Sequence, residues 1–205
     1  MEIKILGNQV VMSRGVKGNE HTRLRELLDR NSSIDTVILK DSPGGDSDAG
    51  YKVGELIRAY GLKTAVSGYC HSSCSRMFLG GKERYFTDDQ PAHKTSVAFH
   101  GNYKSNGQLN WDKVGYLTGW IVKYSDGKAD EALVARWARI EKERGFVYFF
   151  DPTRLMRADR VSVFFCHGDE PKENHFDYCE KLPDKNAYQL GVVTSETLIH
   201  VNQLQ

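Results

Sequence analysis

Short apolar runs alternate with helical stripes along the first hundred residues of the chain. Two β-rich stretches in residues 3–16 flank a turn at residues 7–9, which predicts a hairpin. Leucines recur at the i, i+3, i+4 spacing within residues 20–31, which predicts a helix with one buried face. Residues 36–40 form an apolar run typical of a buried strand. Four apolar residues between 53 and 60 then form a second stripe, which predicts a helix that ends at Gly61.

The same alternation continues to residue 100. Residues 63–68 predict a strand, and residues 72–81 have the small first residues and the glycine-rich end of a short helix. Residues 84–87 and 96–100 predict two more short strands. Because each helix begins where an apolar strand ends, the pattern predicts an α/β fold with a largely parallel sheet. In such sheets, ligands bind at the carboxyl ends of the strands.

The second half of the chain has a different pattern. Residues 101–108 are polar and predict an exposed loop bordering the site. Residues 129–145 predict a helix that ends at its final glycine, and an aspartate-proline pair predicts the start of another helix over 152–160. Residues 161–182 predict a charged-turn hairpin, and residues 185–195 a short closing helix and a final strand.

Composition narrows the class of protein. With 205 residues and 40% hydrophobic content, the chain is large enough for one well-packed domain, so we expect a single domain over residues 1–205 with the hairpin at about 161–182 inserted. The net charge of +1 argues against binding to nucleic acid, which needs many cations. No apolar run approaches the ~18 residues of a membrane span.

Four cysteines fall in two local pairs, Cys70 with Cys74 and Cys166 with Cys179. This pattern favours two disulfides and an oxidising compartment, so we expect an exported protein in which Met1 stands where a signal peptide was removed. Four free thiols would instead indicate the cytoplasm. A zinc site that uses Cys70, His71 and Cys74 is an alternative. The Cys-x-x-x-Cys spacing argues against it, because residues four apart on a helical turn lie ~6 Å apart and can form a disulfide.

Two turns at strand ends could carry chemistry. Gly44 and Gly45 follow Pro43, and their N–H groups could face a carbonyl because no Cβ obstructs them. Ser72 and Ser73 begin the short helix, where a serine is held rigidly among free N–H groups. His100 ends the apolar strand that follows. Each feature also has an ordinary structural explanation, namely a tight turn, a helix cap and a structural histidine.

The stretches VILKDSPGGDSDAGYKVGELIR, TAVSGYCHSSCSRMFLGG and SVAFHG together resemble the Clp protease proteolytic subunit family of serine peptidases, which belongs to the crotonase-like superfamily. The likeness is greatest to ClpP-like predicted periplasmic proteins of bacteria, whose Cys-x-Ser-x-Cys motif is matched by CHSSC. It covers about residues 3–101 and resumes weakly at NAYQLGVVTS. The resemblance implies a crotonase-like, ClpP-like spiral of β-β-α units.

The resemblance also implies roles for individual residues. The serine of the Gly-x-x-x-Ser motif falls on Ser72 as the nucleophile, and the histidine at the strand end falls on His100 as the general base. The oxyanion hole falls on the N–H groups of Gly44, Gly45 and Ser73.

The third residue of the family's triad, an aspartate before the closing helix, has no unambiguous counterpart. Asp177 is preferred for its position near the closing segment, and Asp159 fits if the whole hairpin is an insertion. Asp151 is interpreted as a helix cap and Asp169 as a residue of the hairpin turn. Without a carboxylate on its far nitrogen, His100 would lose control of its tautomer.

The expected function is a serine hydrolase that cleaves peptide or small acyl substrates, with no metal and no cofactor. A catalytically inactive module that binds a peptide or a protein is the alternative, and a crotonase-type acyl-coenzyme A enzyme ranks third. The family's ring-stacking loop and helix are not recognisable in residues 101–120, so a large barrel with an unfoldase partner is not expected. A smaller homo-oligomer remains compatible with the sequence.

Overall fold

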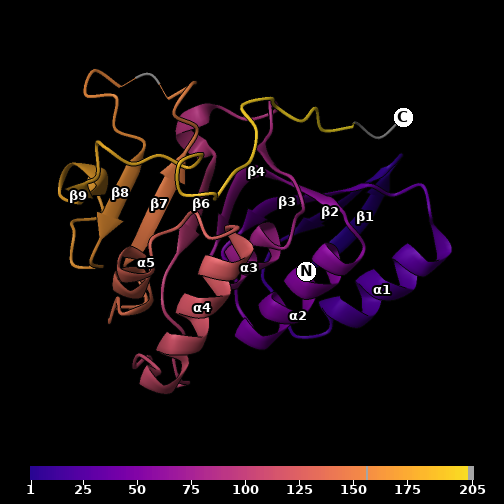
Figure 1. Cartoon of the computed structure of the whole chain (residues 1–205), viewed down its shortest axis with the longest axis horizontal. Coiled ribbons are helices and arrows are strands. Elements are labelled where there is room, and N and C mark those ends of the chain that lie inside the picture. The colour runs from indigo at the N-terminus through magenta and orange to yellow at the C-terminus, as the bar shows by residue number, and fades with distance from the viewer. Residues whose placement is uncertain (156, 203–205) are drawn as a thin grey trace. The chain divides into compact units, whose positions relative to one another are not determined.

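The computed structural model describes residues 1–155 and 157–202 and divides the chain into two compact units (Figure 1). The first unit comprises Met1–Val97 and Val193–Gln205, and the second comprises Ala98–Val192. The strand β6 (Ser96–Phe99) carries the chain from the first unit into the second. No helix among the described residues is both long and apolar enough to cross a membrane.

The first unit contains a mostly parallel sheet. Its first two strands, β1 (Glu2–Leu6) and β2 (Gln9–Ser13), form the predicted antiparallel hairpin. Beyond them β3 (Thr36–Ser42), β4 (Lys63–His71) and β5 (Arg84–Phe86) pair in parallel, in that order. The carboxyl ends of β2, β3 and β4 therefore meet at one edge of the sheet, as the strand-turn-helix recurrence predicted.

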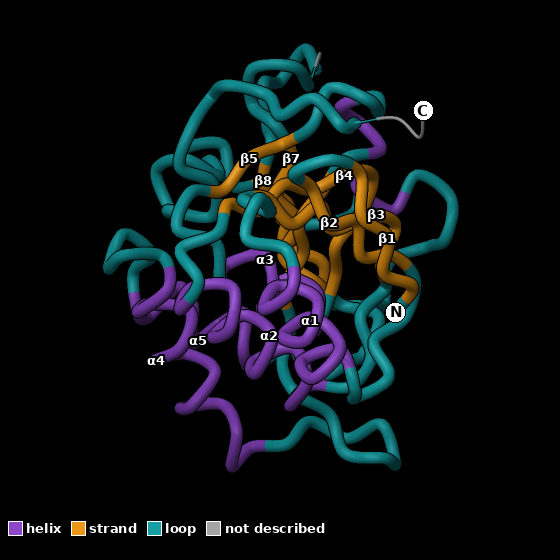
Figure 2. Tube along the Cα trace, turned by 90° about the vertical axis from the view of Figure 1, so that its right-hand side faces the viewer, coloured by secondary structure: helices purple, strands orange, loops and turns teal. Residues whose placement is uncertain are grey.

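Three helices of the first unit lie on one side of these strands in both views (Figures 1 and 2). They are α1 (Glu20–Arg30), α2 (Ser47–Ala59) and α3 (Ser73–Leu79), and a short 3-10 turn, η1 (Ala92–Lys94), follows β5. The predicted stripes are buried except at Leu27 of α1, which is half-buried, and at Tyr60, which caps α2 and is 41% exposed. The buried stripe of α2 thus ends with Leu56 and Ile57.

The other face of the sheet is covered by the end of the chain. Val11, Ile38 and Ala65 alternate with residues that point toward the helices, and they pack with Tyr85 and Val201. The closing helix and strand expected over 185–195 are absent from that stretch, which consists of turns and bends. The segment after it is held to the sheet by hydrogen bonds, among them Gln9 Nε2 to the carbonyl oxygen of His200 at 2.8 Å.

The second unit has an antiparallel set of strands and two helices. β7 (Phe146–Phe150) pairs with β8 (Val163–Cys166), which pairs with β9 (Glu180–Lys181). The predicted hairpin over 161–182 is therefore present. The helices are α4 (Val114–Tyr124) and α5 (Glu131–Ala138), and the 3-10 turns are η2 (Trp111–Lys113) and η3 (His175–Asp177).

Two predicted helices of the second unit differ from the sequence-based expectations. The helix predicted over 129–145 ends at Ala138, because the residues after Ile140 are charged and offer no apolar face. Residues 152–155 and 157–160 form turns instead of a helix. Asp151 accounts for this, since its Oδ1 accepts hydrogen bonds from the N–H and the hydroxyl of Thr153, which stabilises a local turn.

Candidate active site

A register shift brings the ends of β3 and β4 into line. Lys40 pairs with Ser67, but the next pair is Ser42 with Cys70, so β4 contains one extra residue. Gly68 lies in this bulge with φ +70°, and a Cβ there would be 2.0 Å from Oδ1 of Asp41. The positive φ favours glycine and a Cβ would displace the Asp41 carboxylate, and the bulge sets the Pro-Gly-Gly turn beside the segment that carries Ser72.

Ser72 occupies the sharp turn between β4 and α3. Its backbone has φ 55° and ψ −127°, a conformation that costs a non-glycine residue about 1–3 kcal/mol and persists only where the surroundings enforce it. Its side chain makes no capping hydrogen bond to α3, which the structure describes completely. The helix-cap explanation for this hydroxyl is therefore wrong. A serine on a strained strand-to-helix turn is the arrangement of a nucleophile elbow.

Ser73 differs from Ser72 in its surroundings. Ser73 is 0% exposed, whereas Ser72 is half-buried. Ser73 packs against Gly50 of α2, where a Cβ would be 2.5 Å from the Ser73 carbonyl oxygen. At the other end of α3, a Cβ on Gly80 would be 2.2 Å from the carbonyl oxygen of Gly54. These glycines let α2 and α3 approach closely, which holds the start of α3 in place and favours Ser72 as the reactive serine.

The Pro-Gly-Gly turn packs directly onto the elbow. Gly44 has φ +92°, and a Cβ there would be 2.6 Å from Cβ of Ser72 and 2.9 Å from N of Ser73. Gly45 has φ +142°, and a Cβ there would be 2.3 Å from the carbonyl oxygen of Val16. The N–H of Val16 donates to the Gly44 oxygen at 2.8 Å, which fixes the turn on its other side. Both glycines are thus required by close backbone approach.

The candidate oxyanion donors differ in their present partners. The N–H of Gly44 donates to Oγ of Ser42 at 3.3 Å. Within residues 1–155 and 157–202, the N–H groups of Gly45 and Ser73 have no acceptor. The Ser73 N–H is one of the first amides of α3, which have no partner inside the helix. Gly45 and Ser73 therefore retain the donors that the sequence assigned to them.

A disulfide joins Cys70 of β4 to Cys74 of α3, with an S–S distance of 2.04 Å and a Cα–Cα distance of 5.2 Å; we name it the elbow disulfide. The predicted pairing is confirmed. The expected geometry of a helical turn is wrong, because Cys70 lies on a strand and the bridge spans the strand-to-helix junction around Ser72. Both sulfurs are used by the bridge, which removes the basis of a Cys70, His71 and Cys74 zinc site.

The second predicted pair, Cys166 and Cys179, is also joined, with a Cα–Cα distance of 4.6 Å; we name it the hairpin disulfide. In the described part of the chain, the one group of potential metal ligands consists of these two cysteines and Glu170. Thiolates, not disulfide sulfurs, are the ligands that metals prefer, so the bridge argues against a metal there.

His71, which the sequence offered only as a zinc ligand, makes a specific contact in the first unit. Its Nε2 lies 2.9 Å from Oγ of Ser96 at the start of β6. Burial lowers the pKa of His71 to about 4, so the ring is neutral at physiological pH. His71 thus links the elbow to the strand that leads to His100. No spacing in the sequence signals this bond.

His100 lies in the second unit, just after β6. Its ring stacks on that of Phe146 with centroids 4.1 Å apart and an interplanar angle of 18°. The ring of Tyr103 is 4.9 Å away, and the Tyr103 hydroxyl donates to the carbonyl oxygen of Ile140 at 2.7 Å. Aromatic side chains therefore fix the plane of the imidazole. Ser72 belongs to the first unit, so its partnership with His100 stays a prediction.

The three aspartates considered for the triad have different surroundings. Asp177 lies in η3 with a 63% exposed side chain, 3.9 Å from Arg157. Asp159 accepts hydrogen bonds from Arg157 and Lys181, and these hold its pKa well below the usual range. Asp151 is 0% exposed, and its Oδ2 has no hydrogen-bond partner among the described residues. The choice between Asp177 and Asp159 stays a prediction.

Comparisons with known proteins identify the fold. No protein family and no curated protein matches the chain. A mutant of ClpP1 from Listeria monocytogenes matches with a TM-score of 0.51 and 14% identity, over 63% of this chain and 78% of that one. A mutant of 1510-N, a membrane-bound stomatin-specific protease, matches with a TM-score of 0.47 and 13% identity, over 63% of this chain and 67% of that one. The ClpP1 match, whose TM-score exceeds 0.5, shows that the chain has a ClpP-like α/β fold.

Proposed function

We propose that this protein is a serine hydrolase of ClpP-like fold that cleaves peptide or small acyl substrates with Ser72 as its nucleophile. The observation that carries the proposal is the backbone of Ser72, held at φ 55° and ψ −127° between β4 and α3. The backbone of Ser72 is strained and its side chain does not cap α3, and strain of this kind is concentrated at reactive positions.

In the proposed mechanism His100 accepts the proton of Ser72 as the hydroxyl oxygen attacks a substrate carbonyl. The N–H groups of Gly45 and Ser73, with that of Gly44, stabilise the negative charge that develops on the carbonyl oxygen. The leaving group takes the proton from His100, and water then releases the acyl group. Asp177, or Asp159 in its place, would hold the tautomer of His100.

The proposal extends to the cell compartment. The two disulfides indicate an oxidising environment, and the periplasm is the compartment that we propose. Titration of the native protein with a thiol reagent is expected to detect no free cysteine, because the structure contains none. Detection of four thiols in freshly extracted protein would contradict this assignment.

Labelling with a fluorophosphonate probe tests the catalytic centre. The native protein is expected to be labelled and S72A to be unlabelled, while the matched control S73A, which changes the buried neighbouring serine, retains labelling. H100N is expected to slow labelling by about 10²–10⁴-fold, the usual contribution of a general base. D177N and D159N then identify the orienting carboxylate, because only one should reproduce the loss. A folded native protein that is never labelled would instead support the inactive binding module.

A further inference from the structure

A cavity of about 350 Å³ in the second unit lies beside the ring that stacks on His100. It lies between the start of β7 and the connection from β8 to η3, and we name it the Phe146 pocket. Phe146, Tyr148 and His175 supply its aromatic wall. At ~30 Å³ per water molecule, the volume equals about a dozen waters, which suits a single amino-acid side chain with its terminal group.

The aromatic wall is held firmly. The ring of Tyr148 meets His175 at 5.9 Å and Phe176 at 5.1 Å, both edge to face. Burial raises the pKa of Tyr148 to about 12, so its hydroxyl stays neutral. Phe146 connects this wall to His100, since its ring also lies 5.5 Å from that of Tyr148. A planar apolar group would therefore find preformed ring surfaces close to the imidazole.

The charged residues that line the pocket differ in whether they already have a partner. Arg144 and Lys172 line it, and neither has a carboxylate within 4.0 Å among the described residues. Of the two acids that line it, Glu170 accepts hydrogen bonds from the N–H groups of His167 and Gly168. Burial raises the pKa of Glu170, but these backbone hydrogen bonds outweigh it and lower the pKa overall. Glu143 is the second acid. Within the ranges that the structure describes, the lining of the pocket therefore carries two cations without an ion pair, Arg144 and Lys172, and one carboxylate that is not already hydrogen-bonded.

We propose that the Phe146 pocket binds a carboxylate that carries an aromatic or large apolar side chain, as at the C-terminus of a peptide. The Arg144 guanidinium can grip a carboxylate with two parallel hydrogen bonds, and Lys172 adds a second positive charge. The side chain would rest on the rings of Phe146 and Tyr148. This inference rests on the proposed hydrolase and names its substrate class, a peptide with a free C-terminal carboxylate.

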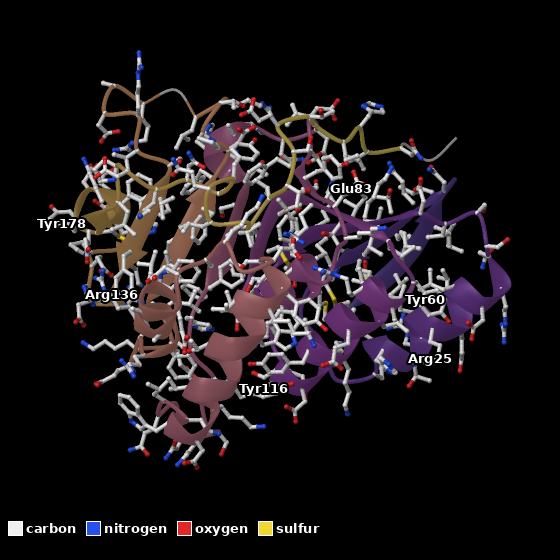
Figure 3. The ribbon with its side chains drawn as sticks, viewed as in Figure 1. Arg25, Tyr60, Glu83, Tyr116, Arg136 and Tyr178 are labelled. Carbon is white, nitrogen blue, oxygen red and sulfur yellow. A yellow bond between two sulfur atoms is a disulfide. The ribbon has the colours of Figure 1, made fainter. Side chains whose placement is uncertain are left out.

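Calorimetric titration of the whole protein with N-acetyl-L-phenylalanine and with its uncharged amide tests the pocket. The acid is expected to bind about tenfold more tightly than the amide, because only the acid can form a charge-assisted pair with Arg144. R144Q should reduce this ratio to about one. The matched control R25Q removes an exposed arginine of α1 in the first unit and should keep the preference (Figure 3).

Equal affinities for acid and amide in the native protein, no binding of either, or an unchanged preference in R144Q would each overturn the proposal. K172Q serves as a second variant if R144Q does not fold, and a weakened preference is then the supporting result. Fluorophosphonate labelling of the native protein, measured beside the titration, separates this inference from the proposed function. Acid-selective binding in a protein that is never labelled by fluorophosphonate would refute the hydrolase alone, whereas labelling without acid preference would refute the pocket alone.

Discussion

Replacement of Gly44 by alanine tests the contact between the Pro-Gly-Gly turn and the elbow. The added Cβ would be 2.6 Å from Cβ of Ser72 and 2.7 Å from the carbonyl oxygen of His71, and neither neighbour is the end of a flexible side chain. The residue also has φ +92°, which disfavours alanine. The backbone conformation costs about 1–2 kcal/mol and the overlap about 1–3 kcal/mol, so G44A should lose about 2–5 kcal/mol of unfolding free energy.

The matched control is G61A. Gly61 also has a positive φ, +67°, but nothing lies within 4 Å of the Cβ that alanine would add. It should therefore lose only the conformational part, about 1–2 kcal/mol. Urea denaturation of the two variants and the native protein measures both losses. The difference between the variants isolates the steric contact.

The same substitution should act on the proposed chemistry. A shift of the elbow by about 1 Å is enough to slow a positioned reaction by about 10²-fold, so G44A should be labelled by fluorophosphonate far more slowly than G61A. If G44A unfolds at the same urea concentration as G61A and is labelled equally fast, the turn does not press on the elbow, and the reasoning from this contact is wrong.

Three further outcomes are expected. Paired serine substitutions that remove the elbow disulfide should lower the unfolding free energy by about 2 kcal/mol, and those that remove the hairpin disulfide by about 3 kcal/mol, because each bridge restricts the unfolded chain. Urea denaturation measures both losses. Only removal of the elbow disulfide should also slow fluorophosphonate labelling. Because burial lowers the folded-state pKa of His71 from 6.5 to about 4, the unfolded chain binds more protons between these values, and stability should fall as pH falls through this window. H71N should flatten that part of a urea-midpoint profile. G115A and G119A on α4, where a Cβ meets nothing within 4 Å, should each stabilise the protein by about 0.5–1 kcal/mol in thermal unfolding.

Sequence patterns predicted the first unit well because its local preferences and its tertiary contacts agree. The apolar run of β3, the stripe of α2 and the turns between them all depend on nearby residues. The position of Ser72 at a strand-to-helix junction followed from the same pattern. The strained backbone of Ser72 did not follow from that pattern. It is enforced by Gly44, which is remote in sequence, and by the bulge at Gly68, which hydrophobic periodicity does not reveal.

The second unit was predicted less well because its elements depend on tertiary packing. The helix α4 contains Gly115 and Gly119, which lower helix propensity, and buried contacts of its apolar residues override that tendency. No sequence-based prediction covered residues 146–150, which form β7. The stacking of Phe146 on His100 therefore could not be anticipated, and the pocket next to it was missed with it.

The return of residues 193–202 to the first unit has a consequence for biosynthesis. Thr194 donates its N–H to the carbonyl oxygen of Arg84, and Asn202 donates to the side chain of Gln9, so these contacts join segments 110 and 193 residues apart. A ribosome or a secretion channel delivers the chain from its N-terminus, and the whole second unit emerges before the sheet of the first can be covered. Until those residues are made, the face of the sheet formed by Val11, Ile38 and Ala65 lacks its cover from Val201.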